Sequence, residues 1–235
     1  MSTPQAWSGP GIILSFFKLL DSPTISEETL EDWFGREYAP ALIASGVVKK
    51  AWLYQAANAD YDKQHLIVYN VPELAQVQAG KIQEVPRTSN SGLFEGTVDG
   101  YIEIETRIYS FVQLYEKSAH GEEAAPVMML AMVQPAQGGE ADLDAWYKDE
   151  HNEQMSKEPG YWRTSRFSLL HQHSTGSQQN EKLSFLAVHE FGEENALGTE
   201  VKPLDPMTDW TKKVMASAKG IDAAIYHKQR GFGDS

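Results

Sequence analysis

The sequence of 235 residues contains no cysteine, no Asn-x-Ser/Thr sequon and no long apolar run. The absence of cysteine excludes disulfides, thiolate nucleophiles and cysteine-based metal sites. No apolar stretch approaches the roughly 20 residues that a membrane-spanning helix needs. Residues 1–11 also lack the basic and apolar segments of a signal peptide. These absences favour a cytoplasmic protein.

Positive charge is scarce as well, because 20 Lys and Arg residues are set against 33 Asp and Glu residues, for a formal net charge of −13. Nucleic acids and anionic membranes attract basic surfaces, so neither is expected as a partner. The acids lie mainly in predicted helix starts and loops, where they favour solubility. Walker, G-x-G-x-x-G, G-x-S-x-G and H-E-x-x-H motifs are missing. Nucleotide, flavin and serine-hydrolase chemistry therefore have no support, and no cofactor is expected.

The chain repeats itself over a long interval. A helical stripe in the first half returns 113 residues later, with an imidazole in place of a phenol at its end. The matched positions are Leu30, Trp33, Phe34, Glu37 and Tyr38 in the first half and Leu143, Trp146, Tyr147, Glu150 and His151 in the second. A repeat of this length indicates that a half-size structural unit is used twice.

Each half is expected to contain the order strand, helix, strand, strand, helix, strand, which is the ferredoxin-like order. In the first half, strands are predicted at 12–20, 47–55, 65–71 and 106–116, with a helix from Ser26 to Gly46 and a short helix within 72–96. In the second half, strands are predicted at 127–133, 163–171, 183–191 and 221–227, with helices from Asp142 to Pro159 and over 209–219. A polar loop rich in Ser, Gln and Gly separates the two middle strands of the second half. Ser26 and Asp142 are the expected N-caps.

The second-half helix and the strand after it carry a recognisable motif. The run DLDAWYKDEH at 142–151, followed by PGYWR at 159–163, resembles the EthD-like branch of the dimeric α/β-barrel superfamily. Over residues 11–232 the chain is similar to fungal tandem proteins with two such domains. The superfamily includes cofactor-free monooxygenases, polyketide cyclases, decarboxylases, lactone isomerases and haem-linked enzymes. The first half departs from the pattern, because Tyr38 stands where the motif has histidine and Pro40 follows closely.

The predicted fold class is therefore α+β, with two tandem ferredoxin-like units forming an intramolecular dimeric α/β barrel. The units are expected at residues 11–117 and 126–232, joined by a linker at 118–125. Each sheet has a second apolar face, and packing the two sheets face to face would cover both. Side-by-side packing is the less favoured alternative because it leaves wide apolar faces exposed.

Three residues are candidates for catalysis. His151 lies on the apolar stripe of its helix, and the resemblance implies that it lines a cavity between helix and sheet, where it could transfer a proton. The alternative is a core histidine with a single hydrogen bond. Tyr38 could donate to a carbonyl or enolate oxygen, although core packing is favoured there. His189 interrupts an apolar strand at the position of Tyr69 in the first half, and it could reach the same pocket as His151.

Four further residues, namely Trp146, Tyr147, Arg166 and Tyr69, are candidates for substrate binding. Arg166 could bind a carboxylate or phenolate, and solvent exposure is equally compatible with its position. Glu37 and Glu150 lie off the apolar stripe and are expected to be structural, for example through a bond to Arg166. His171 and His173 have the spacing of a metal-ligand pair. No third ligand is evident near them, so a solvated loop is favoured and no metal is expected.

These features predict a cofactor-independent enzyme of secondary metabolism that cyclises, dehydrates, decarboxylates or isomerises an apolar, oxygenated small molecule. One alternative is a cofactor-free monooxygenase that acts on a phenolic substrate. Another is a non-catalytic binding or stress protein with closed pockets. The expected partner is an apolar, polyketide- or aromatic-like substrate, and homo-oligomerisation beyond the internal pseudo-dimer is left open.

Overall fold

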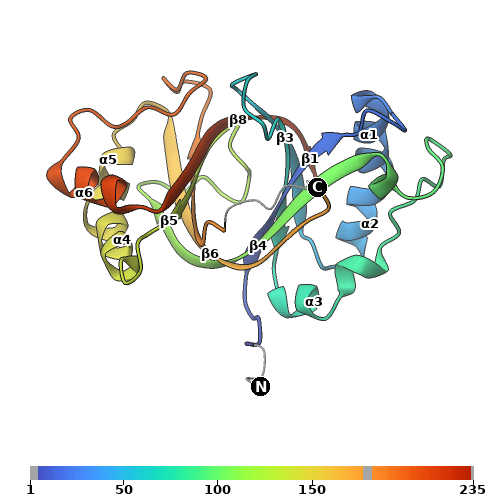
Figure 1. Cartoon of the computed structure of the whole chain (residues 1–235), viewed down its shortest axis with the longest axis horizontal. Coiled ribbons are helices and arrows are strands. Elements are labelled where there is room, and N and C mark those ends of the chain that lie inside the picture. The colour runs from blue at the N-terminus through green and yellow to red at the C-terminus, as the bar shows by residue number, and fades with distance from the viewer. Residues whose placement is uncertain (1–4, 177–181, 234–235) are drawn as a thin grey trace.

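The computed structural model describes residues 5–176 and 182–233, and its eight strands close into one antiparallel barrel (Figure 1). Around the barrel the strands follow the order β1-β3-β2-β8-β5-β7-β6-β4, and β4 pairs with β1 to close the ring. The first half of the chain supplies β1 (Gly11–Leu19), β2 (Lys50–Ala56), β3 (His65–Val71) and β4 (Ile102–Glu116). The second half supplies β5 (Val127–Gln134), β6 (Tyr161–Ser174), β7 (Phe185–Phe191) and β8 (Gly220–Phe232).

The two halves of the chain meet edge to edge in two strand pairs, β2 with β8 and β4 with β6. The sheets expected to pack face to face are thus opposite walls of one continuous barrel. This arrangement overturns side-by-side packing. Closure also pairs the strand edges that an open sheet would leave exposed.

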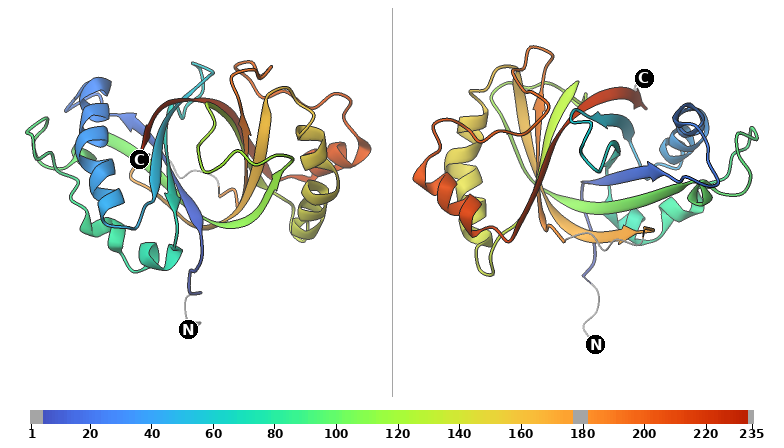
Figure 2. Two further views of the ribbon diagram at one scale, coloured as in Figure 1. Left: turned by 180° about the vertical axis from the view of Figure 1, so that it is seen from behind. Right: turned by 45° about the horizontal axis from the view of Figure 1, so that its top comes forward.

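The helices lie outside the barrel in two groups on opposite sides (Figure 2). On one side, α1 (Glu27–Trp33), the π-helical turn η1 (Phe34–Tyr38) and α2 (Ala39–Ala44) form one helical run. That side also holds α3 (Leu74–Gln78) and the 3₁₀ turns η2 (Lys81–Glu84) and η3 (Val98–Gly100). The other side holds α4 (Glu140–Trp146), the π-helical turn η4 (Tyr147–His151), α5 (Asn152–Met155) and α6 (Asp209–Ser217).

The helix ends follow local chemistry in most places. Ser26 caps α1, since its Oγ accepts a hydrogen bond from the backbone N–H of Thr29 at 3.1 Å. Gly46 adopts a φ of +75° just after α2, which is the left-handed conformation that ends helices. The predicted cap at Asp142 is wrong: the N-cap position of α4 is Gly139. Asp142 lies in the first turn, where its negative charge still suits the helix dipole.

Strand alternation divides the apolar side chains into inner and outer cores. In β1, Ile12, Leu14 and Phe16 belong to a cluster inside the barrel, whereas Ile13 and Phe17 pack against the helices outside. Successive strand residues point to opposite faces, and both faces of this sheet are covered. β1 therefore reads as a nearly continuous apolar run.

The predicted strands were correct in place but several were too short. β4 begins at Ile102, β6 runs from Tyr161 to Ser174 and β8 extends to Phe232. The predicted polar loop after β6 lies in part outside the described residues. Within the described ranges, no helix has both the length and the apolar character needed to cross a membrane.

Candidate active site

A π-helical turn places the key histidine of the second half. The turn η4 spans Tyr147–His151, and η1 occupies the matching positions Phe34–Tyr38 in the first half. Such turns insert one residue into an α-helix and occur often at functional sites. Tyr147 and His151, the first and last residues of η4, both face the sheet and line the same cavity.

A cavity of about 660 Å³ lies between this helical run, α6 and the outer face of β5, β7 and β8. Its volume is typical of sites for small organic molecules. We call it the helix-side cavity. Its wall is mainly apolar and includes four methionines, whose flexible thioethers adapt to flat ligands. The lining includes Trp146, Tyr147, His151, His189, Met129, Met155, Met207 and Met215, together with residues 199–204 of the loop before α6.

His151 lies in this wall between two aromatic rings. Its imidazole stacks on Trp146, with ring centroids 4.1 Å apart and an interplanar angle of 21°, and meets the Tyr147 ring edge-on at 5.1 Å. The Nδ1 atom is buried and has no hydrogen-bond partner among the described residues. Burial, and secondarily the charge of Arg166, lowers the pKa of His151 to about 3. The ring is therefore neutral at pH 7 and can accept a proton.

His189 lies beside it, fully buried in β7, with its ring centroid 5.5 Å from that of His151. Its Nδ1 is 2.8 Å from Thr164 Oγ1, whereas its Nε2 has no partner within the described chain. The hydroxyl of Tyr161 then lies 2.9 Å from Thr164 Oγ1 and donates to the carbonyl oxygen of Tyr115 at 3.1 Å. Burial, followed by the charge of His151, lowers the pKa of His189 well below its usual value. A chain of hydroxyls thus connects a buried imidazole to a half-buried tyrosine.

Trp146 and Tyr147, both expected to bind substrate, line the cavity. The indole Nε1 of Trp146 donates to Thr211 Oγ1 at 3.1 Å, which fixes the ring on which His151 stacks. Tyr147 is 4% exposed, and burial raises its pKa to about 12 although Arg166 acts in the opposite direction. Its protonated hydroxyl makes no hydrogen bond to the described residues, so it remains available to a ligand oxygen.

Arg166 is placed behind the cavity and is absent from its described lining. Its guanidinium lies 4.3 Å from the centre of the Tyr147 ring and pairs with Asp144 at 2.8 Å. It also donates to Gln113 Oε1 at 2.9 Å. These contacts support the ring of Tyr147, and they give no support to the predicted direct contact between Arg166 and substrate.

The two matched helix glutamates of the repeat, Glu37 and Glu150, have structural contacts, but not the one expected with Arg166. Glu150 accepts hydrogen bonds from Thr208 and Thr211, which joins the π-helical turn to the start of α6. Glu37 instead accepts from Ser91 and other groups of the 89–91 loop. The carboxylate that pairs with Arg166 is Asp144, which also pairs with Lys148 one helical turn later. The sequence had indicated Glu150 for this contact.

The matching position in the first half is filled. The space around Tyr38 and Tyr69 measures about 20 Å³, too little for an organic ligand. Tyr38 stacks on Trp33 with centroids 4.9 Å apart, and the Arg87 guanidinium lies 5.7 Å from the Tyr38 ring centre. Tyr38 and Tyr69 therefore belong to a packed core on the opposite side of the barrel from His151.

The predicted metal-like pair lies on the exposed end of β6. His171 and His173 are both exposed, and His171 has the ring of Trp7 6.3 Å away. Across residues 5–176 and 182–233, no group of three or more His, Asp or Glu side chains is arranged to hold a metal ion. His171 and His173 lie away from the helix-side cavity.

Sequence reasoning missed Thr164, Tyr161 and the methionines of the cavity wall. Strand alternation could have found Thr164, because it shares a face of β6 with Arg166, two residues on. The methionines come from β5, α5, α6 and the preceding loop, so their convergence depends on the tertiary fold.

No protein-family model matches the sequence, and no curated protein matches it. The chain is similar to the structure of an anthrone oxidase-like protein, with a TM-score of 0.56, 11% identity and coverage of 95% of this chain and 92% of that one. It is also similar to a provisionally assigned monooxygenase from Fusobacterium nucleatum subsp. nucleatum (TM-score 0.58, 9% identity, 95% and 94% covered). A third such structure comes from Lactobacillus acidophilus (TM-score 0.52, 12% identity, 95% and 95% covered). The chain thus has the fold of the dimeric α/β-barrel proteins, and at these identities the likeness shows the fold alone.

Proposed function

We propose that the chain is a cofactor-independent, cytoplasmic enzyme of the EthD-like type, built from two tandem ferredoxin-like units, with a single working site in its second half. The observation that carries the proposal is the pair of neutral imidazoles, His151 and His189, on the wall of a 660 Å³ apolar cavity. A buried polar atom without a partner costs free energy and calls for an explanation. Both rings carry such an atom when partners are sought within residues 5–176 and 182–233.

The first chemical step is removal of a proton from a phenolic or enolisable substrate by His151. Although burial lowers its pKa, a negative charge developing on the substrate favours the imidazolium and raises that pKa. The hydroxyl of Tyr147 donates to the oxygen that gains charge. The methionines and Trp146 hold a flat apolar ring system against the sheet.

The hydroxyl chain behind His189 determines which nitrogen of that ring carries its proton. When Tyr161 donates to the Tyr115 carbonyl, Thr164 can donate to Tyr161 and accept from His189 Nδ1, which leaves Nε2 as a base. When Tyr161 donates to Thr164, the order reverses and Nε2 carries the proton. Reversing the hydroxyl donors therefore exchanges the two neutral tautomers of His189, and the tautomer with a free Nε2 takes a proton from the substrate and returns it from the same atom.

The deprotonated substrate has two outcomes. It can rearrange, by cyclisation, dehydration, decarboxylation or isomerisation. Alternatively it can react with dioxygen, and the names of the similar structures favour this second candidate. For a methylene group flanked by aromatic rings, oxidation to a ketone releases four electrons; dioxygen accepts them, leaving one oxygen atom in the product and the other in water.

A non-catalytic role would be favoured by a closed cavity and a His151 bonded to backbone, and the helix-side cavity shows neither feature. The test is turnover of anthrone, a ketone that enolises to a phenol, and of related phenols, measured by ultraviolet absorbance in air and under nitrogen. His151→Ala should lower turnover by roughly 10²–10⁴-fold, the usual contribution of a general acid or base. Tyr38→Phe, the matched change in the filled half, should leave turnover within about twofold. Loss of activity in Tyr38→Phe alone would assign the site to the first half.

A further inference from the structure

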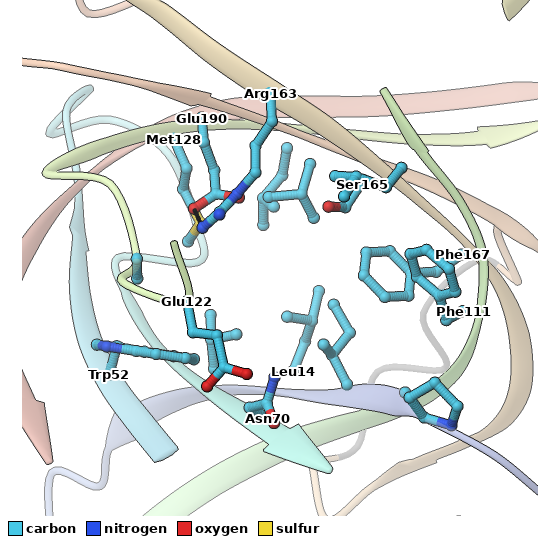
Figure 3. A pocket seen from close by; sticks show the side chains of 18 of the residues that line it. Leu14, Trp52, Asn70, Phe111, Glu122, Met128, Arg163, Ser165, Phe167 and Glu190 are labelled. Carbon is cyan, nitrogen blue, oxygen red and sulfur yellow. Dashed lines mark hydrogen bonds and ion pairs between the residues drawn. The ribbon is translucent and has the colours of Figure 1, made fainter. Parts of the chain in front are cut away.

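The barrel itself encloses a second cavity, of about 280 Å³, at the end crossed by residues 118–125. We call it the barrel cavity. Figure 3 shows the open space, with Phe111 and Phe167 on one side and Trp52 on the other. Eight-stranded barrels have interiors that side chains just fill or that hold one small ligand. The volume left here is close to the lower limit for organic ligand sites.

The charged groups around the barrel cavity are already paired. Arg163 forms an ion pair with Glu190 and donates to the carbonyl oxygens of Gly121 and Glu123. Lys49 pairs with Glu122. Each positive charge has a negative partner, so the cavity offers no surplus charge to an ionic ligand. An uncharged ligand is the chemical match.

Two polar side chains in the wall remain available. Asn70 and Ser165 both line the cavity, and neither side chain forms a hydrogen bond to a residue within 5–176 or 182–233. The rest of the wall is largely apolar. One ligand group that donates or accepts a hydrogen bond, carried on an apolar body, would satisfy this combination.

A β-bulge opens an apolar entrance to the cavity. The pairing of β4 with β6 skips Val112, between Phe111 and Gln113. Bulges concentrate at barrel rims and beside binding sites, where they redirect side chains. Phe111 and Leu114 both line the cavity, yet they remain 42% and 47% exposed. Apolar side chains exposed at a cavity mouth are typical of ligand entrances.

The two cavities lie back to back across the sheet. In β5, Met128 lines the barrel cavity and Met129 the helix-side cavity; in β7, Val188 and His189 divide in the same way. The strands therefore form a wall between two separate spaces. A molecule in one space does not occupy the other.

We propose that the barrel cavity is a second ligand site, which takes an uncharged, flat aromatic molecule of one or two fused rings bearing one hydrogen-bonding group. The site is independent of any catalysis in the helix-side cavity. Residues 118–125, held across the barrel end by Arg163 and Lys49, form its cover.

The test uses 5-bromoindole, which is flat, uncharged and carries one N–H donor. Crystals of the full chain are soaked with it, and the anomalous signal of bromine locates each bound molecule. Titration calorimetry measures the affinity of each site. Asn70→Phe fills the barrel cavity from the first half of the chain, and Asn70→Leu is a milder version if the larger residue prevents folding. Ala131→Phe fills the helix-side cavity and is the matched control.

Bromine is expected in the barrel cavity of the wild-type chain and of Ala131→Phe. In crystals of Asn70→Phe that bromine should disappear. In calorimetry the dissociation constant of the barrel site should be at least about tenfold higher in this variant than in the wild type. Bromine only in the helix-side cavity, or in neither cavity at the solubility limit of the probe, would overturn the proposal. So would equal occupancy of the barrel cavity in Asn70→Phe and wild type.

Discussion

The buried imidazole of His151 should make the stability of the protein fall as the solution is acidified. In the unfolded chain its pKa returns to about 6.5, whereas in the folded chain it is about 3. Between these two values the unfolded state binds the additional proton. Because the folded-state pKa of this base is depressed, its stabilising contribution is complete above pH 6.5 and is lost as pH falls towards 3.

The size of the effect follows from these two pKa values. A pH of 5 is about 1.5 units below the pKa of the unfolded histidine, which is therefore protonated, whereas the folded histidine is still neutral. Protonation of the unfolded state alone lowers the free energy of unfolding by about 2 kcal/mol relative to pH 8. His189 acts in the same direction, since burial also lowers its pKa. Carboxylates add little to this difference at pH 5. The pKa of Asp144, for example, is lowered mainly by its hydrogen bond to Lys148, so this group loses its charge only at a more acidic pH.

Urea denaturation at pH 8 and pH 5, on the wild type and on His151→Phe, measures this contribution. Phenylalanine keeps the stacking on Trp146 and removes the titrating group. Between pH 8 and pH 5 the free energy of unfolding of the variant should therefore fall by about 2 kcal/mol less than that of the wild type. The slope against urea should be unchanged, which would show that both states keep their compactness. An equal pH dependence in the two chains would refute the burial of a neutral imidazole at this position.

Three further predictions concern other residues. Thr164→Val should lower turnover by about tenfold or more and shift its pH profile, because it breaks the chain behind His189 while keeping the shape of the side chain; an unchanged profile in steady-state kinetics would remove that chain from the mechanism. Elemental analysis of the purified protein should find no stoichiometric zinc, iron or haem, and about one metal per chain that is lost on mutating His171 and His173 together would contradict this. Arg166→Met should lower the melting temperature less than Asp144→Ala, since only the second leaves a buried guanidinium without its carboxylate; the reverse order in thermal melts would contradict this account.

The repeat in the sequence predicted which residues occupy equivalent places, and the structure shows how. Leu30 and Trp33 in α1 and Leu143 and Trp146 in α4 are all buried, and the two π-helical turns begin at equivalent residues. The apolar stripe was readable because helical periodicity depends on local sequence. The π-helical turns themselves were not predicted, since one inserted residue changes the spacing only slightly.

The difference between the two halves could be read only in part. The exchange of Tyr38 for His151 pointed to the second half, but the sizes of the two spaces, about 20 Å³ and 660 Å³, depend on packing between distant segments. In the first half the rings of Trp33 and Phe34 pack against Tyr38, and Phe94 packs against Trp33. In the second half the loop over residues 199–207 extends the cavity instead.

The bulge at Val112 explains why the role of Arg166 could not be predicted. Strict alternation along β4 would place Phe111 and Gln113 on the same face. The skipped residue moves Gln113 to the helix side, where it accepts from Arg166, and turns Leu114 into the barrel. One irregularity thus holds Arg166 against Tyr147 and at the same time forms the entrance of the barrel cavity. Periodicity predicts the faces of regular strands, and both cavities depend on a departure from it.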